Sequence, residues 1–599
     1  MRTPAETSGA AVEVGASLCW TETMGMMDGK SVIGVLVLAC YIAAGSGCGS
    51  TSVSRDGPAA PSATTPRDRT LVVIDRGEPP SLASRSLVPA AGVGLGGTQS
   101  VFNATLVLLD DQGRTSPYLA DSIPQLDTAS WMVLPDGRME TVYALRPGLV
   151  WHDGTPLTSN DFAFAWRVYG TPVFGQTGSG ALASVEDVLS PDARTVLIRW
   201  RQPYANAAIE GIPPLPRHLL EQPFQDLDGQ AFISHPFWTM EYVGAGPYRL
   251  ERRDPGVSIE GTAFDAHALG RAKIDRVRIV FMSDANTAVA NLLTGSAHFA
   301  SRFLLYYEEG TTLERQWAAK GGGGTVAWRP TLPRIWIVQL RPEYAVPGEL
   351  LDLRVRRALA HGIDAAALNQ AMTGGRGVVS GTLTSPLADY AAAVNSTVSR
   401  YPYDPSAAHR LLEDAGLTKG SSGTYASPRT GTFTLELWNV DGASNERENT
   451  IVADDLSRLG IPTSRHSFSV LQSSDNQARA TVPGLFATSG GADGEALLPN
   501  YTIANIPTAD NRWRGSNRGG WANAEYSRVL DAFQTTLDVA TRTQQIAEME
   551  RIFSQEVPAI PLYFTPEVTA FSSELKGPVE SKFPGTVLPL GLVHTWEWK

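Results

Sequence analysis

The pair His152-Asp153 is a place in the sequence where side chains could carry a proton or bind a metal ion, because an imidazole and a carboxylate do both. Gly154 follows the pair, and a turn between a strand and a helix explains these residues without any reaction. The other histidines, for example His361 and His466, show no HExxH or similar ligand spacing. The sequence therefore predicts no metal site, and we interpret the pair as structural.

Other signals of an enzyme are weak. The run Gly321–Gly324 lacks the Lys-Ser/Thr of a phosphate-binding loop, and we interpret it as a surface loop. The GxSxG motif of one class of serine hydrolases is absent. The carboxylate pairs Glu308-Glu309 and Asp454-Asp455 stand in polar contexts typical of solvated faces. These residues favour a binding protein over an enzyme.

Composition narrows the possible partners. The chain has 599 residues, with 49 Lys and Arg against 61 Asp and Glu, so its net charge of −12 does not suit the phosphate backbone of nucleic acid. A 43% hydrophobic fraction with 14 Trp indicates a chain that buries a core. Single cores rarely grow beyond about 250–300 residues, so we expect more than one lobe.

The first part of the chain reads as an export signal. The apolar segment 32–44 follows Lys30 and has the length of a secretion-signal core, which is too short to span a bilayer. We predict a signal peptide over residues 1–47, with translation starting at Met24, Met26 or Met27 because the residues before Lys30 are acidic.

Cys48 ends a run of small residues that resembles the lipobox of bacterial lipoproteins, although Gly45 stands where Leu or Val is usual. We expect lipidation at Cys48; an ordinary secretory signal with an incidental cysteine is the alternative. All three cysteines of the chain lie in this region, so the body has no disulfide. Residues 48–69 are rich in Ser, Thr, Pro and Gly and predict a flexible linker behind the anchor.

Strands and helices alternate in the body beyond this linker. We expect strands over 71–75 and 141–145, and a short apolar strand within 149–156. Thr158 and Asp161 have the spacing of a capping box, and apolar residues recur behind them at helical intervals.

The pattern repeats downstream. We expect a strand over 277–281 followed by a helix capped by Asp284, a helix begun by Asp404-Pro405, and a strand over 433–437 paired with a helix that ends at Gly460. Near the end, a helix stops before Pro558 and a strand follows it. The alternation predicts an α/β fold.

Five blocks in order resemble the family 5 solute-binding proteins, the extracytoplasmic receptors of peptide, nickel and related ABC importers. The segment from Leu145 to Asp161, LRPGLVWHDGTPLTSND, is the most characteristic block. The others are VGAGPYRL at 243–250, DLRVRRALAHGID at 352–364, YPYDP at 401–405 and VPAIPLY at 557–563. Together they extend over nearly the whole body.

The resemblance implies a two-lobe periplasmic-binding-protein-like fold, of type II and the three-domain cluster C kind, with a ligand cleft between the lobes. The first lobe would comprise residues 70–100, 235–330 and 565–599, with an inserted domain at 101–234. The second lobe would comprise residues 331–564.

The resemblance also points to ligand-binding residues. In peptide receptors of this family an aspartate corresponding to Asp493 pairs with the α-ammonium group of the ligand, and Gly491 stands beside it. A solvent-exposed loop aspartate is the alternative, because Gly494-Glu495-Ala496 replaces the usual turn and Ala487 replaces an arginine of some relatives. Aromatic residues in segments that line the cleft in relatives are further candidates for contact with the ligand, and core packing is the alternative role for each. They are Trp336, Trp438, Phe486, Trp513 and Trp521.

These features predict a lipid-anchored receptor outside the cytoplasmic membrane that binds an oligopeptide or peptide-like solute. It would act as a monomer, without cofactor or metal and without nucleic acid, and deliver the solute unchanged to an ABC permease. A receptor of the same fold for a sugar or a metal chelate is one alternative. An extracytoplasmic hydrolase of peptides or glycans is the other.

Overall fold

The computed structural model describes residues 69–87, 97–174, 181–429, 431–469, 471–490, 494–580, 582 and 589–599. The predicted signal peptide, Cys48 and all but the last residue of the predicted linker lie outside the described residues. The chain divides into one unit of residues 1–65 and a second from Pro66 to Lys599, and every described residue belongs to the second.

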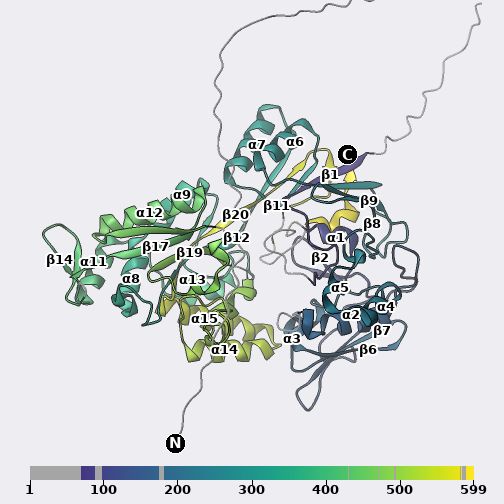
Figure 1. Ribbon diagram of the computed structural model, residues 1–599, viewed down its shortest axis with the longest axis horizontal. Coiled ribbons are helices and arrows are strands. Elements are labelled where there is room, and N and C mark those ends of the chain that lie inside the picture. Colours follow the sequence, from purple (N-terminus) through teal and green to yellow (C-terminus); the bar gives the residue numbers. More distant parts are fainter. Residues whose placement is uncertain are drawn as a thin grey trace, which may run out of the picture. The chain divides into compact units, whose positions relative to one another are not determined.

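A mixed sheet runs through this second unit in the order β18-β17-β19-β12-β20-β11-β1-β10-β9-β8. The strands β12 and β20 pair antiparallel from Gly324 and Ser572 to Ile337 and Ala559, so both run from one half of the sheet into the other (Figure 1). The strand bounds are Thr70–Asp75 (β1), Tyr248–Asp254 (β8), Ser258–Ala263 (β9), Arg276–Phe281 (β10), Phe299–Leu305 (β11), Gly324–Val338 (β12), Leu435–Val440 (β17), Thr463–Phe468 (β18), Leu485–Ser489 (β19) and Ala559–Ser572 (β20).

The two halves of the sheet pack against different hydrophobic cores. One half, the first lobe, packs residues from Leu71 to Phe299 together with residues from Leu575 to Trp596. The other half, the second lobe, packs residues from Trp336 to Tyr563. Since burial of apolar surface is the main stabilising contribution to each core, separate cores indicate separately stabilised lobes.

Strand β12 shows how the second lobe is layered. Trp336 and Val338 belong to one core, and Ile335 and Ile337 belong to another, because successive side chains of a strand point to opposite faces. The first core also contains residues of α8 (Leu353–Gly362), α9 (Ala365–Thr373), α11 (Pro405–Asp414) and α12 (Ala443–Leu459). The second contains residues of α13 (Asn476–Ala480), α14 (Ala524–Thr535) and α15 (Val539–Glu556). In Figure 1, α14 and α15 lie on the other side of the strands from α9 and α12.

The first lobe also contains a separate antiparallel sheet in the order β4-β5-β7-β6, whose bounds are Trp131–Val133, Met139–Ala144, Thr195–Trp200 and Val185–Asp192. Helix α2 (Ser159–Tyr169) packs on it, and α3 (Ala181–Ser184) precedes β6. On the main sheet of the first lobe, α6 (Ala285–Thr294) and α7 (Tyr307–Ala319) follow β10 and β11. The domain boundaries expected from the family resemblance stay a prediction.

The predicted helix starts are confirmed. Thr158 and Asp161 form a reciprocal capping box at α2, in which the Thr158 backbone N–H donates to Asp161 Oδ2 at 2.7 Å. Asp284 accepts from Thr287 N–H at the start of α6, and Asp404 accepts from Ala407 N–H at the start of α11. The alternation of strands and helices confirms the α/β prediction.

The predicted strand within 149–156 is wrong. The segment is a turn closed by a Trp151 N–H bond to Thr155 O at 2.8 Å, with one isolated bridge between Val150 and Pro156. The turn needs a φ of +87° at Gly154, and Trp151 is buried. The run 149–151 pairs only with the residues just after the turn, through the bond from Trp151 and one from Leu157 N–H to Leu149 O, so it is too short to extend into a ladder.

His152 fastens this turn to another of the characteristic blocks. Its ring is 3% exposed, accepts from Gly244 N–H at 3.2 Å through Nδ1, and lies 3.0 Å from Gly246 O through Nε2. Burial lowers the pKa of His152 to about 4, so the ring is neutral at pH 7. Asp153 Oδ2 lies 2.7 Å from His218 Nε2. The pair therefore holds two segments together, as the structural interpretation expects.

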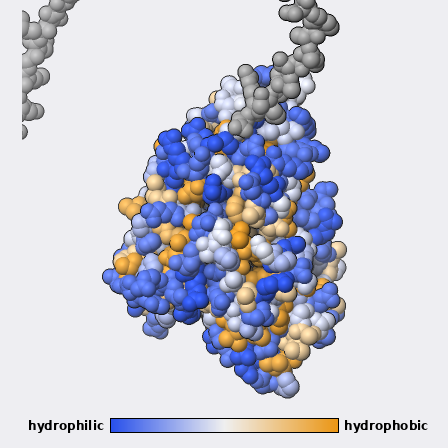
Figure 2. Space-filling model, turned by 90° about the vertical axis from the view of Figure 1, so that its right-hand side faces the viewer, coloured by the Kyte–Doolittle hydropathy of each residue, from blue (hydrophilic) through white to orange (hydrophobic). Residues whose placement is uncertain are grey.

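None of the helices in the described part of the chain combines the length and the apolar character that a bilayer crossing requires. Figure 2 shows a mostly hydrophilic face, with a strip of hydrophobic residues near its middle and small separate groups elsewhere.

Candidate functional site

A cavity of about 280 Å³ lies where β12 and β20 pass from one lobe to the other, and we call it the crossing-strand cavity. The crossing strands supply Thr331, Leu332, Tyr563 and residues 565–568. The first lobe adds Phe303, Leu305, Tyr306, Tyr307 and Glu308, and the second adds Arg334, Met372, Thr373, Ser444, Asn445, Glu448 and Ser489. The walls of this cavity therefore come from both lobes.

The buried carboxylate of Glu448 organises one wall of this cavity. Arg334 Nε donates to Glu448 Oε2 at 2.9 Å, and Trp336 Nε1 donates to Oε1 at 3.1 Å. Tyr563 Oη lies 3.4 Å from Oε2. The Arg334 and Glu448 side chains are only 11% and 2% exposed. A buried carboxylate that accepts from several donors is fixed in place, so this wall is rigid and polar.

Arg334 has further partners on the same wall. Its Nη1 donates to Ser489 Oγ at 3.1 Å and its Nη2 to Asn445 Oδ1 at 3.4 Å. Burial alone would lower the pKa of Arg334, but the adjacent Glu448 carboxylate outweighs burial and raises it. The guanidinium group therefore stays charged and joins β12, β19 and α12.

A second carboxylate, Glu567 of β20, lines the same cavity between two arginines. Arg302 Nη2 lies 2.8 Å from one of its oxygens and Arg329 Nη2 lies 3.3 Å from the other, and all three residues are buried. Phe303, next to Arg302, has a φ of +63°. A phenylalanine in this left-handed region is strained, and such strain concentrates at ligand sites and switch regions.

A larger cavity of about 590 Å³, the polar cavity, also has walls from both lobes. Tyr204 and Glu210 of the first lobe are joined by a hydrogen bond of 2.7 Å from the phenol to the carboxylate. Glu495 and Arg542 of the second lobe form an ion pair. Its remaining lining residues are Ala183, Ser184, Arg201, Gln202, Ala205, Asn206, Ala496, Pro499, Phe533 and Gln534. Charges of both signs suit a zwitterionic or multiply charged solute.

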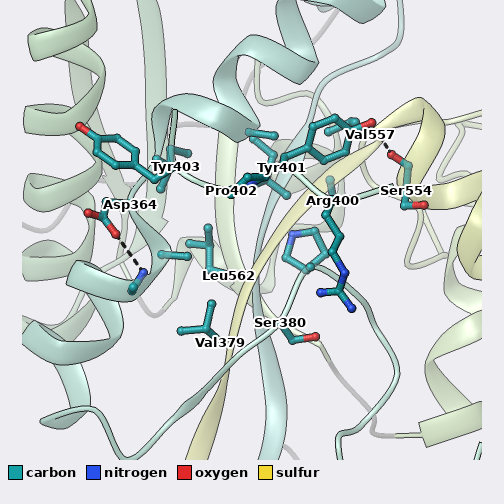
Figure 3. A pocket seen from close by; sticks show the side chains of 18 of the residues that line it. Asp364, Val379, Ser380, Arg400, Tyr401, Pro402, Tyr403, Ser554, Val557 and Leu562 are labelled. Atoms are coloured by element: carbon teal, nitrogen blue, oxygen red, sulfur yellow. Dashed lines mark hydrogen bonds between the residues drawn. The ribbon is translucent and has the colours of Figure 1, made fainter. Parts of the chain in front are cut away.

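A third cavity of about 380 Å³ lies within the second lobe (Figure 3). It is mainly apolar, and its lining residues come from segments 360–366, 379–381, 400–403 and 553–562. Tyr401 Oη donates to Ser554 O at 2.9 Å, and Asp364 caps α9, so these two polar groups serve the fold. Since no first-lobe residue among those described lines this cavity, it does not join the two lobes.

The structure places the predicted site residues in different surroundings. Asp493 and Gly491 lie outside the described residues. In the sequence they stand between Ser489, which lines the crossing-strand cavity, and Glu495, which lines the polar cavity. Residues on either side of Asp493 along the chain therefore line the two cavities that have walls from both lobes.

The predicted aromatic residues lie in the second lobe, and three of them are buried. Trp336, Phe486 and Trp521 are at most 4% exposed, which agrees with the alternative of core packing. Trp438 is half-buried and stacks on His466 with ring centroids 4.7 Å apart. Trp513 is half-buried with a φ of +59°. None of the five lines the crossing-strand or the polar cavity, so ligand contact by them stays a prediction.

Several cavity residues were missed by the sequence reasoning. Arg334 stands two positions before Trp336, so the period of a strand places both on one face, and that signal could have identified Arg334. Glu448 is separated from Arg334 by 114 positions, and no local pattern links them. Among the described residues, no group of three or more His, Cys, Asp or Glu side chains is arranged to hold a metal ion.

Comparisons with known proteins agree with this architecture. An ABC transporter peptide-binding protein of Brucella ovis is 25% identical to this chain over 364 residues. The match covers 57% of this chain and 62% of that relative, so the chain spans about three fifths of the relative's length. The oligopeptide-binding protein of Thermus thermophilus, crystallised with a pentapeptide, has a TM-score of 0.69 at 23% identity, over 89% of this chain and 97% of that one. NikZ of Campylobacter jejuni, crystallised with Ni(L-His), has a TM-score of 0.67 at 19% identity, over 89% of this chain and 100% of NikZ.

These likenesses confirm the two-lobe fold of the periplasmic-binding-protein type. Residues 121–493, more than half of the chain, match the middle region of one sequence family. The chain belongs to the bacterial extracellular solute-binding proteins, family 5.

Proposed function

We propose that this protein is the substrate-binding lipoprotein of an ABC importer, and that it captures oligopeptides or peptide-like solutes between its two lobes. The lipid on Cys48 would keep it at the outer face of the cytoplasmic membrane. It would act as a monomer without a cofactor and pass the solute unaltered to a permease. The proposed lobes are residues 70–100, 235–330 and 565–599 with the insert 101–234, and residues 331–564.

One observation carries the proposal: two cavities have walls from both lobes, and residues on either side of Asp493 in the sequence line them. A ligand that touches both lobes only in the closed arrangement favours that arrangement by its differential affinity. Volumes of about 280 and 590 Å³ are of the size that small-molecule and short-peptide ligands need. Peptide-binding names among the relatives support the same solute class.

The role of Asp493 can be tested with the full chain by calorimetric titration. A charge-assisted hydrogen bond to an α-ammonium group is worth about 1.5–3 kcal/mol. Asp493→Asn should therefore weaken binding of a peptide with a free amino terminus by roughly 10- to 150-fold. The acetylated form of the same peptide should bind wild type and variant about equally.

A matched control is Asp389→Asn, which changes a second-lobe aspartate that lines none of the three cavities. It should leave both affinities unchanged. Equal affinity of the wild type and Asp493→Asn for the free-amino peptide would remove Asp493 from the site.

A metal chelate is the second candidate solute, because a structural neighbour of the same fold holds Ni(L-His). Parallel titrations with a peptide mixture and with nickel–histidine separate the two. Tighter binding of the chelate would favour the second candidate. Cleavage of the added peptides over time would favour a hydrolase instead.

A further inference from the structure

Three arginines of the second lobe lie close together without an acidic partner. Arg341 follows β12, Arg479 lies in α13, and Arg518 lies in the loop before α14. Arg341 is 8% exposed, and the other two are half-buried. None of the three forms an ion pair with a carboxylate of the described residues, in contrast to Arg302, Arg329 and Arg334.

Arg341 fixes the other two in place through their backbone. Its Nη1 donates to Pro507 O at 2.9 Å, and its Nη2 donates to Arg518 O at 3.1 Å and to the carbonyl of Ala480, the residue after Arg479. These acceptors are neutral carbonyls, so they leave the positive charge uncompensated.

Two glycines make this close packing possible. A Cβ on Gly520, whose φ is +70°, would lie 2.4 Å from Arg341 Cγ. A Cβ on Gly519 would lie 2.3 Å from Val338 O. Any side chain at these positions would push the loop away from β12, so the loop that carries Arg518 depends on both glycines.

Arg479 and Arg518 line one small cavity together with Gln339, Phe486 and Gly519. Arg479 Nη1 donates to Ser473 O at 3.3 Å, but its buried Nε has no hydrogen-bond partner among the described residues. The Arg518 side chain donates no hydrogen bond to any residue that the structure describes. The cavity of about 10 Å³ has room for about one water-sized particle.

The electrostatics of this cavity favour an anion over water. Burial, with a smaller contribution from the neighbouring Arg479, lowers the pKa of Arg518 to about 10, so both groups stay charged at pH 7. Partly buried charges of one sign repel each other and are costly unless they are paired. A water molecule can accept their hydrogen bonds but cannot neutralise them.

We infer that Arg479 and Arg518 bind a small inorganic anion of chloride size in the second lobe, outside the crossing-strand and polar cavities. The ion would accept the free N–H groups of both guanidinium groups. It would thereby join α13 to the loop before α14. The size of the cavity favours a halide over a phosphate, sulfate or carboxylate group.

The test uses the full chain without any peptide, so its outcome is independent of the proposed function. Thermal unfolding is followed at constant ionic strength while sodium gluconate is replaced by sodium chloride. The wild type should gain a saturable rise in Tm. Arg518→Met and Arg479→Met should lose that rise, and Arg410→Met, which removes an exposed arginine of α11, should keep it.

A second measurement needs no variant and so does not depend on variants folding. Crystals soaked in sodium bromide should show an anomalous peak between the Arg479 and Arg518 guanidinium groups. The absence of this peak would overturn the inference, as would an equal chloride-dependent rise in all four proteins. A site that responds only to carboxylate-bearing solutes and not to halides would overturn it as well.

Discussion

Replacing Glu448 by Gln tests the buried network of the crossing-strand cavity. The substitution keeps the shape of the side chain but removes the charge opposite Arg334, which is 11% exposed and 2.9 Å away. Breaking one partner of a buried ion pair typically costs about 3–5 kcal/mol, because the other charge stays buried without compensation. The Gln amide would also present a donor to the N–H of Trp336 or the O–H of Tyr563.

We therefore expect Glu448→Gln to lower the free energy of unfolding of the second lobe by about 3–5 kcal/mol. Urea unfolding followed by circular dichroism and by tryptophan fluorescence measures this, and coincidence of the two probes establishes a single transition. The exposed Glu446 on the same helix provides the control. Glu446→Gln should cost under about 1 kcal/mol, the usual size of a charge–helix-dipole interaction.

Arg334→Gln combined with Glu448→Gln completes a double-mutant cycle. Because the second change removes the uncompensated charge, the double variant should be less destabilised than the sum of the single variants, by about 1–3 kcal/mol. A loss below about 1 kcal/mol for Glu448→Gln, or strict additivity of the two changes, would refute the reasoning about this wall.

Two pH-dependent predictions rest on buried groups. Burial lowers the pKa of His152 to about 4, whereas an unfolded histidine has a pKa of about 6.5. The unfolded state therefore binds the proton more readily than the folded state. As a result, the free energy of unfolding falls as the pH drops from about 6.5 to about 4, by up to roughly 3 kcal/mol. In a comparison of unfolding free energies across that pH range, His152→Gln should not show this fall. His466→Gln, at an exposed site, should show the same fall as the wild type. Identical pH profiles for the wild type and His152→Gln would contradict the prediction. Glu550 is 1% exposed and burial raises its pKa to about 7, so the folded state binds the proton more readily and stability falls as the pH rises from about 4.5 to about 7. Glu550 accepts from Thr384 Oγ1 and from Leu383 N–H, and Gln can accept only one of these bonds, so the comparison uses the pH dependence of stability rather than its absolute value. The unfolding free energy of Glu550→Gln should not fall between about pH 4.5 and pH 7, whereas that of the wild type and of Glu413→Gln, on the exposed face of α11, should fall. The same fall in Glu550→Gln as in the wild type would contradict the prediction.

Local signals in the sequence predicted much of the fold. The capping box of Thr158 and Asp161 and the cap at Asp404 are contacts within three residues, so their chemistry can be read without knowing the rest of the structure. The two-lobe arrangement came from the family resemblance rather than from local pattern.

Long-range pairing explains what could not be predicted. Glu448 obtains its partners from β12 and β20, and Arg341 brings together residues from α13 and the loop before α14. Such contacts depend on how strands and helices pack, which periodicity does not specify. The strand predicted within 149–156 is missing because its apolar residues pair only with the residues just after the turn, through a single bridge between Val150 and Pro156, and no further strand extends that pairing.

Native mass spectrometry of the full chain, after incubation with a defined peptide mixture, tests the central claim most directly. The account predicts a bound species whose mass adds one peptide to the protein, and recovery of that peptide at its original mass after denaturation. No bound peptide, or recovery of fragments in its place, would contradict a receptor that holds its solute unchanged.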